Sequence, residues 1–253
     1  MIPELSELLN ESVAACLEDR VGVPFSGGLD STLIAKVASR HTPTNLYTVG
    51  MEGSEDVVYS EKAAKALGLP LEKIILDNNS ILDAYHSCYS IIPLEFLKLG
   101  ILVPIYRLAE YASEKGEEVL LFGAGAEELF VGYERYYGYH EEGKDLDSVL
   151  KDEFRTLQHR EISWMKKICR KFSIKARFPF YNRRLAEFMF SIPLDERMAD
   201  RQLKKGILRE AAKLLGVPQE VVSRKKKALQ YGSGVHRILM KHSKELNEKY
   251  PKP

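Results

Sequence analysis

Short apolar runs alternate with amphipathic segments through the first half of the chain. The runs with the length and setting of buried strands are Val21–Phe25, Leu46–Val49, Lys73–Leu76 and Val119–Phe122. The segments between them carry apolar residues three and four positions apart, which is typical of helices that pack on a sheet. Gly68 follows one of these segments and is expected to cap its helix. The alternation predicts an α/β fold with a doubly wound parallel sheet.

The strand pattern stops at about Tyr133, and the rest of the chain is expected to be mostly helical. Helical periodicity is found in Asp147–Cys169, Asn182–Phe190 and Leu203–Leu215, with prolines between the segments. We therefore expect one domain over residues 1–253, with an α/β half at 1–132 and a helical half at 133–253. Ligands of such sheets bind beyond the carboxyl ends of the strands, so the residues that follow the predicted strands are the first candidates for a site.

Composition excludes several classes of protein. No apolar run reaches the roughly 18 residues of a membrane span, and Met1-Ile2-Pro3-Glu4 lacks the features of a signal peptide. A cytoplasmic location without a membrane partner is expected. The three cysteines form no Cys-x-x-Cys pair, which argues against a zinc site or a dithiol redox site.

Charge is unevenly distributed along the chain. Residues 201–253 contain 14 Lys and Arg but 4 Asp and Glu, a net charge of +10, whereas the whole chain carries +1. A basic end of this kind suits a polyphosphate or an RNA backbone. Solvated helix faces would give the same count, so charge alone does not choose between these interpretations.

A glycine-rich hexapeptide, Ser26-Gly27-Gly28-Leu29-Asp30-Ser31, joins the first predicted strand to a predicted helix. The two glycines allow a sharp bend and a close approach of the backbone to a ligand. Free N–H groups at the helix start, the helix dipole and two serine hydroxyls favour an anion. Asp30 would repel phosphate by itself, but it suits a site in which Mg²⁺ bridges to the phosphates. The loop is not a Walker A loop, because no Gly-Lys-Ser/Thr follows.

The hexapeptide is the signature of the PP-loop ATP pyrophosphatases, and further stretches resemble one branch of them, the asparagine synthetases and β-lactam synthetases. These stretches are Thr48-Val49-Gly50 with Gly53-Ser54, Leu121-Phe122-Gly123-Ala124-Gly125-Ala126-Glu127-Glu128-Leu129-Phe130-Val131-Gly132-Tyr133, Ala176-Arg177-Phe178-Pro179-Phe180, Ile207-Leu208-Arg209-Glu210 and Arg224-Lys225-Lys226. The resemblance runs from about residue 20 to residue 235. It implies a PP-loop fold and an enzyme of asparagine biosynthesis or a related pathway. Such an enzyme adenylates a carboxylate or carbonyl acceptor with release of pyrophosphate, and ammonia or an amine then displaces AMP.

The resemblance also implies roles for single residues. Those that would bind pyrophosphate and its magnesium are Ser26, Gly27, Gly28, Asp30 and Ser31, and those that would contact the adenosine of ATP are Pro24, Val49, Phe122 and Gly123. Asp30 and Glu127 would hold Mg²⁺, with Glu127 in place of the family's aspartate. Lys226 and Asp30 would be the catalytic residues, and Lys226 would offset negative charge as the α-phosphate is attacked. Without the resemblance, Glu127 is interpreted as a residue that stabilises a helix N-terminus, and Lys226 is interpreted as part of a solvated run of lysines. Arg177 is expected to pair with an acid of the helical half or to contact the substrate.

Departures from the family concern the acceptor and the nitrogen source. Ala124, Lys175 and Asn182 stand where the family carries acids, and their replacement around the expected acceptor site argues against aspartate as the acceptor. About 20 residues precede the first predicted strand and residue 2 is Ile, so no glutaminase domain with its N-terminal cysteine is expected. The nitrogen would then come from free ammonia, from a separate glutaminase subunit or from another amine.

Three functions remain open at this point. The first is the amide ligase just described, with ATP and a small-molecule acceptor as ligands. The second is a PP-loop enzyme that modifies a tRNA base, for which the basic C-terminal stretch offers phosphate contacts. The third is a non-catalytic ATP-binding regulatory subunit, which the loss of the acid at Ala124 would permit. A homodimer is a further expectation.

Overall fold

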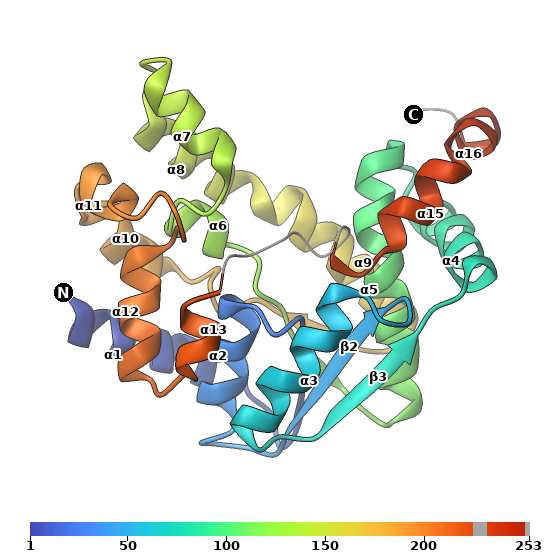
Figure 1. The fold of residues 1–253 in the computed structure, drawn as a ribbon, viewed down its shortest axis with the longest axis horizontal. Helices are drawn as coiled ribbons and strands as arrows, with labels where there is room; N and C mark the ends of the chain where they lie inside the picture. The colour runs from blue at the N-terminus through green and yellow to red at the C-terminus, as the bar shows by residue number, and fades with distance from the viewer. Residues whose placement is uncertain (225–231, 251–253) are drawn as a thin grey trace.

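A five-stranded sheet lies at the centre of the computed structural model, which describes residues 1–224 and 232–250 (Figure 1). The strands are β1 (Val21–Pro24), β2 (Thr44–Gly50), β3 (Leu71–Ile75), β4 (Val119–Leu121) and β5 (Lys175–Arg177). Their order is β3-β2-β1-β4-β5, and every neighbouring pair is parallel. The predicted α/β class and parallel sheet are confirmed.

Helices cover both faces of this sheet. Those described are α1 (Ile2–Ala14), α2 (Leu29–Ala38), α3 (Glu55–Leu67), α4 (Asn78–Ile91), α5 (Phe96–Glu114), α6 (Ala126–Leu129), α7 (Glu134–Glu141), α8 (Leu146–Thr156), the short 3-10 helix η1 (Leu157–His159), α9 (Glu161–Lys171), α10 (Arg183–Ser191), α11 (Leu194–Met198), α12 (Gly206–Leu214), α13 (Gln219–Val222), α15 (Val235–Lys241) and α16 (Ser243–Lys249). Figure 1 shows α1, α2, α12 and α13 grouped on one side and α4, α5, α15 and α16 on the other.

Two apolar cores flank the sheet, and alternate strand residues enter each of them. Val23 and Leu121 pack in the core formed with α1, α2, α10, α12 and α13. Tyr47 and Leu120 pack in the other core, formed with α4, α5, α9, α15 and α16. Successive side chains of a strand point to opposite faces, so a sheet with helices on both sides needs strands that are apolar at nearly every position.

The second half departs from the prediction in three places. The edge strand β5 was not predicted, because two of its three residues are charged and its sequence therefore lacks the apolar pattern of a buried strand. The predicted helix over Asp147–Cys169 is two helices, α8 and α9, separated by η1 and by Arg160 with φ −116° and ψ −114°. The helix predicted from Leu203 begins at Gly206. Gly68 caps α3 in the left-handed conformation, as expected.

The strand order reverses at the centre of the sheet. From β1 the chain builds outward through β2 and β3, and it then returns to the other side of β1 for β4 and β5. The carboxyl ends of β1 and β4 therefore border the crevice where ligands bind in open α/β sheets. Within the described part of the chain, no single helix has the length and apolarity to cross a membrane, although α4 and α5, bent by 111°, pass that test as a pair.

Candidate functional site

The glycine-rich loop lies at this crevice, between the end of β1 and the start of α2. Gly27 has φ +63°, and Gly28 is the N-cap of α2 in an extended conformation. A glycine cap has no side chain to occupy the N–H groups of the first helical turn, so these donors and the positive end of the helix dipole are available to an anion. Ser31, in that turn, donates its hydroxyl to the carbonyl of Gly28 at 3.3 Å. The local geometry is the one that the hexapeptide predicted.

The residues expected at the adenosine lie along the same edge of the sheet. Pro24, Val49 and Phe122 stand at or beside the carboxyl ends of β1, β2 and β4. The side chains of Val49 and Phe122 are buried in the core, which leaves their backbone groups as the atoms that a ligand could contact. Gly123 lies close to Asp30, since a Cβ added to it would be 3.3 Å from the Cβ of Asp30. Strands far apart in the sequence thus bring these positions to one place.

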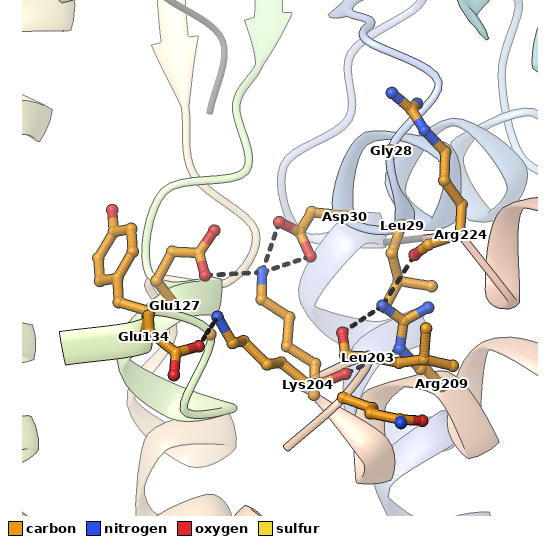
Figure 2. A pocket seen from close by; sticks show the side chains of 13 residues that line it. Gly28, Leu29, Asp30, Glu127, Glu134, Leu203, Lys204, Arg209 and Arg224 are labelled. Carbon is orange, nitrogen blue, oxygen red and sulfur yellow. Dashed lines mark hydrogen bonds and ion pairs between the residues drawn. The ribbon is translucent and has the colours of Figure 1, made fainter. Parts of the chain in front are cut away.

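A cavity of about 180 Å³ opens beside the loop (Figure 2). It is lined by Gly28, Leu29, Asp30, Glu127, Gly132, Tyr133, Glu134, Gln202, Leu203, Lys204, Lys205, Arg209 and Arg224. The lining comes from four parts of the chain: the start of α2, the segment from α6 to the start of α7, the basic segment at the start of α12, and Arg224 after α13. Two predicted residues, Asp30 and Glu127, point toward each other across it. The structure therefore brings together the two predicted metal ligands and the phosphate loop.

Lys205 joins the two acids. Its Nζ donates to Asp30 Oδ1 at 2.9 Å and Oδ2 at 2.7 Å, and it lies 3.2 Å from Glu127 Oε2. The three residues are 4%, 9% and 8% exposed, respectively. Gly132 makes room for the contact, since a Cβ there would collide with the Glu127 carboxylate and with Cε of Lys205. This buried ion triad is the electrostatic centre of the cavity.

A strained turn and a buried guanidinium hold Lys205 in place. Lys204 and Lys205 have φ +59° and +55°, a conformation that costs of order 1 kcal/mol for a residue with a side chain. Arg209, one turn into α12, donates to the carbonyls of Leu203 and Lys204 at 2.6 and 2.7 Å. Burial lowers the pKa of this guanidinium. Arg209 thereby fixes the backbone from which the Lys205 side chain extends.

Arg209 also reaches the next basic residue of the cavity. It donates to the carbonyl of Val222, and to that of Arg224 at 3.0 Å. Arg224 in turn donates to the carbonyls of Ser26 and Gly27, at 3.3 Å each, and its guanidinium lies 3.5 Å from the centroid of the Tyr59 ring. The phosphate loop, the Lys205 turn and the segment that leads to Lys226 are thus tied together by two arginines. Lys226 itself lies outside the described residues.

The basic C-terminal stretch supplies every cation that lines the cavity. Lys204 pairs with Glu134 at 2.6 Å at the cavity wall, and Lys205 pairs with the two buried acids. Arg209 and Arg224 hydrogen-bond mainly to backbone carbonyls, and Arg224 also lies 3.9 Å from the Glu55 carboxylate. Together with the helix dipole of α2, these charges favour a polyanion in the cavity.

The acids of the cavity have the donor chemistry of a magnesium site. Mg²⁺ binds oxygen ligands and is commonly held by one or two carboxylates together with substrate phosphates and water. Asp30 and Glu127 are such a pair, and oxygens of both converge on the Lys205 ammonium. Among the described residues, no group of three or more His, Cys, Asp or Glu gathers as a metal site. A metal held here would therefore complete its shell with ligands from a nucleotide or from water.

Glu128, the neighbour of Glu127, is buried outside the cavity. Burial raises the pKa of its carboxyl to about 7, and the nearby charge of Glu127 adds to the effect. Tyr136 beyond it donates its hydroxyl to Glu153 at 2.6 Å. Glu128 does not line the cavity, so its raised pKa bears on stability rather than on the proposed metal site.

Three residues that the sequence pointed to have other roles. Lys175 is the first residue of β5, at the amino-terminal edge of the sheet, and forms an exposed ion pair with Glu18 at 3.6 Å. Arg177 also pairs with Glu18, at 3.5 Å, so the expected partner in the helical half is wrong. The side-chain oxygen of Asn182 accepts from the N–H of Leu185 at 3.1 Å and caps α10. Lys175 therefore lies at the end of the sheet opposite the glycine-rich loop, Asn182 has a structural role as a helix cap, and Ala124 lies just beyond β4.

The sequence patterns did not point to Lys205, to the space that Gly132 provides or to the clamping role of Arg209. One signal for Lys205 was available. A Lys pair immediately before an amphipathic helix is unfavourable, because the helix dipole repels cations at its N-terminus. A pair of this kind points to acidic partners elsewhere in the fold. The partners themselves, 175 and 78 positions away along the chain, are not visible in the local pattern.

Comparisons with known proteins show the family of this chain and agree with its fold. The asparagine synthase family model matches residues 4–164 and 138–251. The "Putative asparagine synthetase [glutamine-hydrolyzing] 1" of Methanocaldococcus jannaschii is 32% identical over 266 aligned positions, which cover 90% of this chain and 48% of that protein. Asparagine synthetase B of Escherichia coli is 25% identical over 250 positions, which cover 91% and 45%. The chain spans about half the length of the curated relatives it matches.

A solved structure shows the same fold. The NMN synthetase of Francisella tularensis aligns with a TM-score of 0.50 over 91% of this chain and 77% of that chain, at 14% sequence identity. This likeness concerns the fold alone. The family model, in contrast, covers nearly the whole sequence, including the phosphate loop and the segment around α6. The chain belongs to the asparagine synthase family.

Proposed function

We propose that this chain is an ATP-dependent C–N ligase of asparagine synthetase type. In the proposed reaction an acceptor carboxylate attacks the α-phosphate of ATP, pyrophosphate leaves, and ammonia or an amine then displaces AMP from the adenylated acceptor. The observation that carries the proposal is the anion cavity at the glycine-rich loop. It combines the N-terminus of α2 with Lys204, Lys205 and Arg224.

The chain's own residues have separable roles in this proposal. The N–H groups of the Ser26–Ser31 loop would bind the β- and γ-phosphates, which leave together as pyrophosphate. Asp30 and Glu127 would hold Mg²⁺, which when bound would neutralise charge on the phosphate oxygens. Lys226, through its resemblance to the family's catalytic lysine, would offset charge at the α-phosphate. Alignment and charge stabilisation account for most of catalysis in reactions of this type.

The location of the basic residues supports the ligase over the tRNA-modifying alternative. RNA binding was suggested by the excess of Lys and Arg after residue 200. Lys204, Lys205, Arg209 and Arg224 belong to that excess, and all four line the cavity instead of an open surface. A regulatory subunit would have no evident need for a lysine placed against two metal-binding acids.

We propose a carboxylic acid as the acceptor and ammonia as the simplest nitrogen source. Two of the three departures that argued against aspartate lie away from the site or cap a helix. Aspartate is therefore the first acceptor to test, even though Ala124 replaces the family's acid close to the reacting groups. A separate glutaminase subunit as the ammonia source remains part of the proposal.

The test is product analysis by ³¹P NMR. Purified protein is incubated with ATP, Mg²⁺, ammonium and a panel of carboxylic acids that includes aspartate. We expect AMP and pyrophosphate in equal amounts, dependent on one acceptor. ADP with orthophosphate would overturn the proposal. Tight ATP binding without turnover across the panel, with glutamine and a glutaminase present, would favour the regulatory alternative.

A further inference from the structure

The ammonium of Lys205 occupies the point on which the predicted metal ligands converge. Its Nζ lies within 3.2 Å of three carboxylate oxygens of Asp30 and Glu127. The lysine is almost fully buried, so water screens the interaction poorly. Among the residues that the structure describes, the Lys205 ammonium thus places a positive charge between the two acids.

A divalent cation and this ammonium cannot share the position. A metal bound to the two carboxylates would stand within contact distance of Nζ, and the repulsion between the two cations is strong in a buried site. A bare metal must therefore displace the lysine and leave the ammonium charge without its partners. Removing one member of a buried ion cluster is costly, because the remaining charge stays desolvated.

We infer that Lys205 is the counter-ion of Asp30 and Glu127 in the metal-free protein, and that a divalent cation binds these acids only by exchange with its ammonium. The inference rests on the proposed function, since it takes the two acids as the metal site. It predicts that the site discriminates against a bare cation. A cation that arrives with a polyphosphate supplies new anionic partners for the displaced ammonium in the adjoining cavity, so metal and polyphosphate favour each other's binding.

The surrounding structure suits an exchange in which the side chain moves and the backbone does not. Arg209 holds the carbonyls of Leu203 and Lys204, and these residues directly precede Lys205. The four-carbon stem of lysine is flexible and ends in a compact charge. The cavity that adjoins the triad gives the ammonium a place to go.

The experiment measures the binding of Mn²⁺ alone, by the EPR signal of the free ion, to the full chain without nucleotide. The variants are Lys205→Met, which keeps the length and removes the charge, and Lys204→Met as the matched control. Lys204 pairs with Glu134 instead of the two acids. We expect Lys205→Met to bind Mn²⁺ about tenfold more tightly than the wild type or better. Lys204→Met should stay within about twofold of the wild type.

Adding Asp30→Asn to Lys205→Met should abolish the gained Mn²⁺ site, which places the gain at the two acids. The inference is overturned if Lys205→Met binds Mn²⁺ no more tightly than the wild type. It is equally overturned if Lys204→Met produces the same gain, since general charge would then explain both. The readout needs no turnover, so absence of pyrophosphate release would count against the proposed function alone.

A second measurement uses the wild type, in case Lys205→Met fails to fold. The rate of reductive methylation of Lys205 is followed by peptide mass spectrometry with and without Mn²⁺, and Lys204 serves as the internal reference. We expect saturating Mn²⁺ to increase the rate at Lys205 severalfold relative to Lys204. The comparison is made at Mn²⁺ concentrations where EPR shows that the site is filled and that Asp30→Asn abolishes it. An unchanged ratio of the methylation rates of Lys205 and Lys204 under these conditions would overturn the exchange.

Discussion

Gly27 of the phosphate loop lies against the backbone carbonyl of Tyr59, with space for a hydrogen but not for a side chain. A Cβ on Gly27 would be 2.5 Å from that oxygen, and the residue has φ +63°. Tyr59 belongs to α3, so the first bend of the loop rests on the helix that follows β2. Gly28 differs, because its backbone is extended and a Cβ would meet the flexible Ser26 hydroxyl at 3.2 Å.

The two glycines should therefore respond differently to substitution. Gly27→Ala combines backbone strain with a collision against backbone atoms and should displace the loop N–H groups. We expect ATP affinity, measured by calorimetry, to fall more than about 30-fold, equivalent to roughly 2 kcal/mol. Gly28→Ala should weaken binding by less than about tenfold. Equal losses in the two variants would show that flexibility, and not the contact with Tyr59, is what the loop requires.

Arg224 should need its planar guanidinium and not merely its charge. It stacks on Tyr59 at 3.5 Å and donates to two loop carbonyls, a geometry that an ammonium cannot reproduce. We expect Arg224→Lys to raise the KM for ATP in the pyrophosphate assay by about tenfold, because it loses contacts worth roughly 1–2 kcal/mol. Tyr59→Leu removes the stacking alone and should have a smaller effect. Full rescue by lysine would contradict the positioning role.

The fold was predictable where the pattern of residues is repetitive. Val21 and Val119 begin buried runs that only a strand of a covered sheet explains, and the hexapeptide after the first run fixes the strand–loop–helix order. The edge strand β5 escaped prediction, because its charged residues point to solvent and its stability comes from pairing with β4, which no local pattern encodes. The break near Arg160 likewise depends on tertiary packing.

The site was predictable in its loop and in its acids but not in its cations. Asp30 and Glu127 were identified by their motifs, and the structure brings them together. Lys205 was not, because its role arises from a turn with positive φ at two non-glycine residues and from partners far away along the chain. The helix-capping role of Asn182, which the resemblance had associated with the acceptor site, was likewise not predicted.

Glu128 should make stability depend on pH. Its pKa is about 7 in the folded chain and 4.5 ordinarily, so the folded state holds the proton more tightly. Its contribution is present in full below pH 4.5 and is lost as pH rises toward and through 7. On the metal-free protein, we expect Glu128→Gln to gain roughly 3 kcal/mol in free energy of unfolding, relative to the wild type, between pH 4.5 and pH 8. Denaturant unfolding at the two pH values tests this; the exposed Glu220→Gln should show no comparable gain.

Arg209 should be among the most sensitive residues for stability. Its buried guanidinium donates to four backbone carbonyls, which would be left without these donors in Arg209→Met. The expected loss in free energy of unfolding is about 3–5 kcal/mol, and Arg209→Lys should recover less than half of it. The exposed Arg183→Met is the control and should stay close to the wild type. Equal stability of the two methionine variants would refute the clamp.

Restoring the family's acids one at a time should separate the acceptor site from the rest of the fold. Lys175→Glu changes the amino-terminal edge of β5, and Asn182→Asp keeps a good helix cap, since Asn and Asp cap equally well. Neither should change the KM for the acceptor by more than about twofold. Ala124→Glu adds a carboxylate directly after Gly123 at the carboxyl end of β4, where the crevice opens, and should change that KM by about tenfold or more. The KM for the acceptor of each variant is measured from steady-state pyrophosphate release over a range of acceptor concentrations. If Lys175→Glu changed the KM for the acceptor and left the KM for ATP unchanged, the acceptor would bind near the amino-terminal end of β5. That result would contradict an acceptor site at the carboxyl ends of the strands.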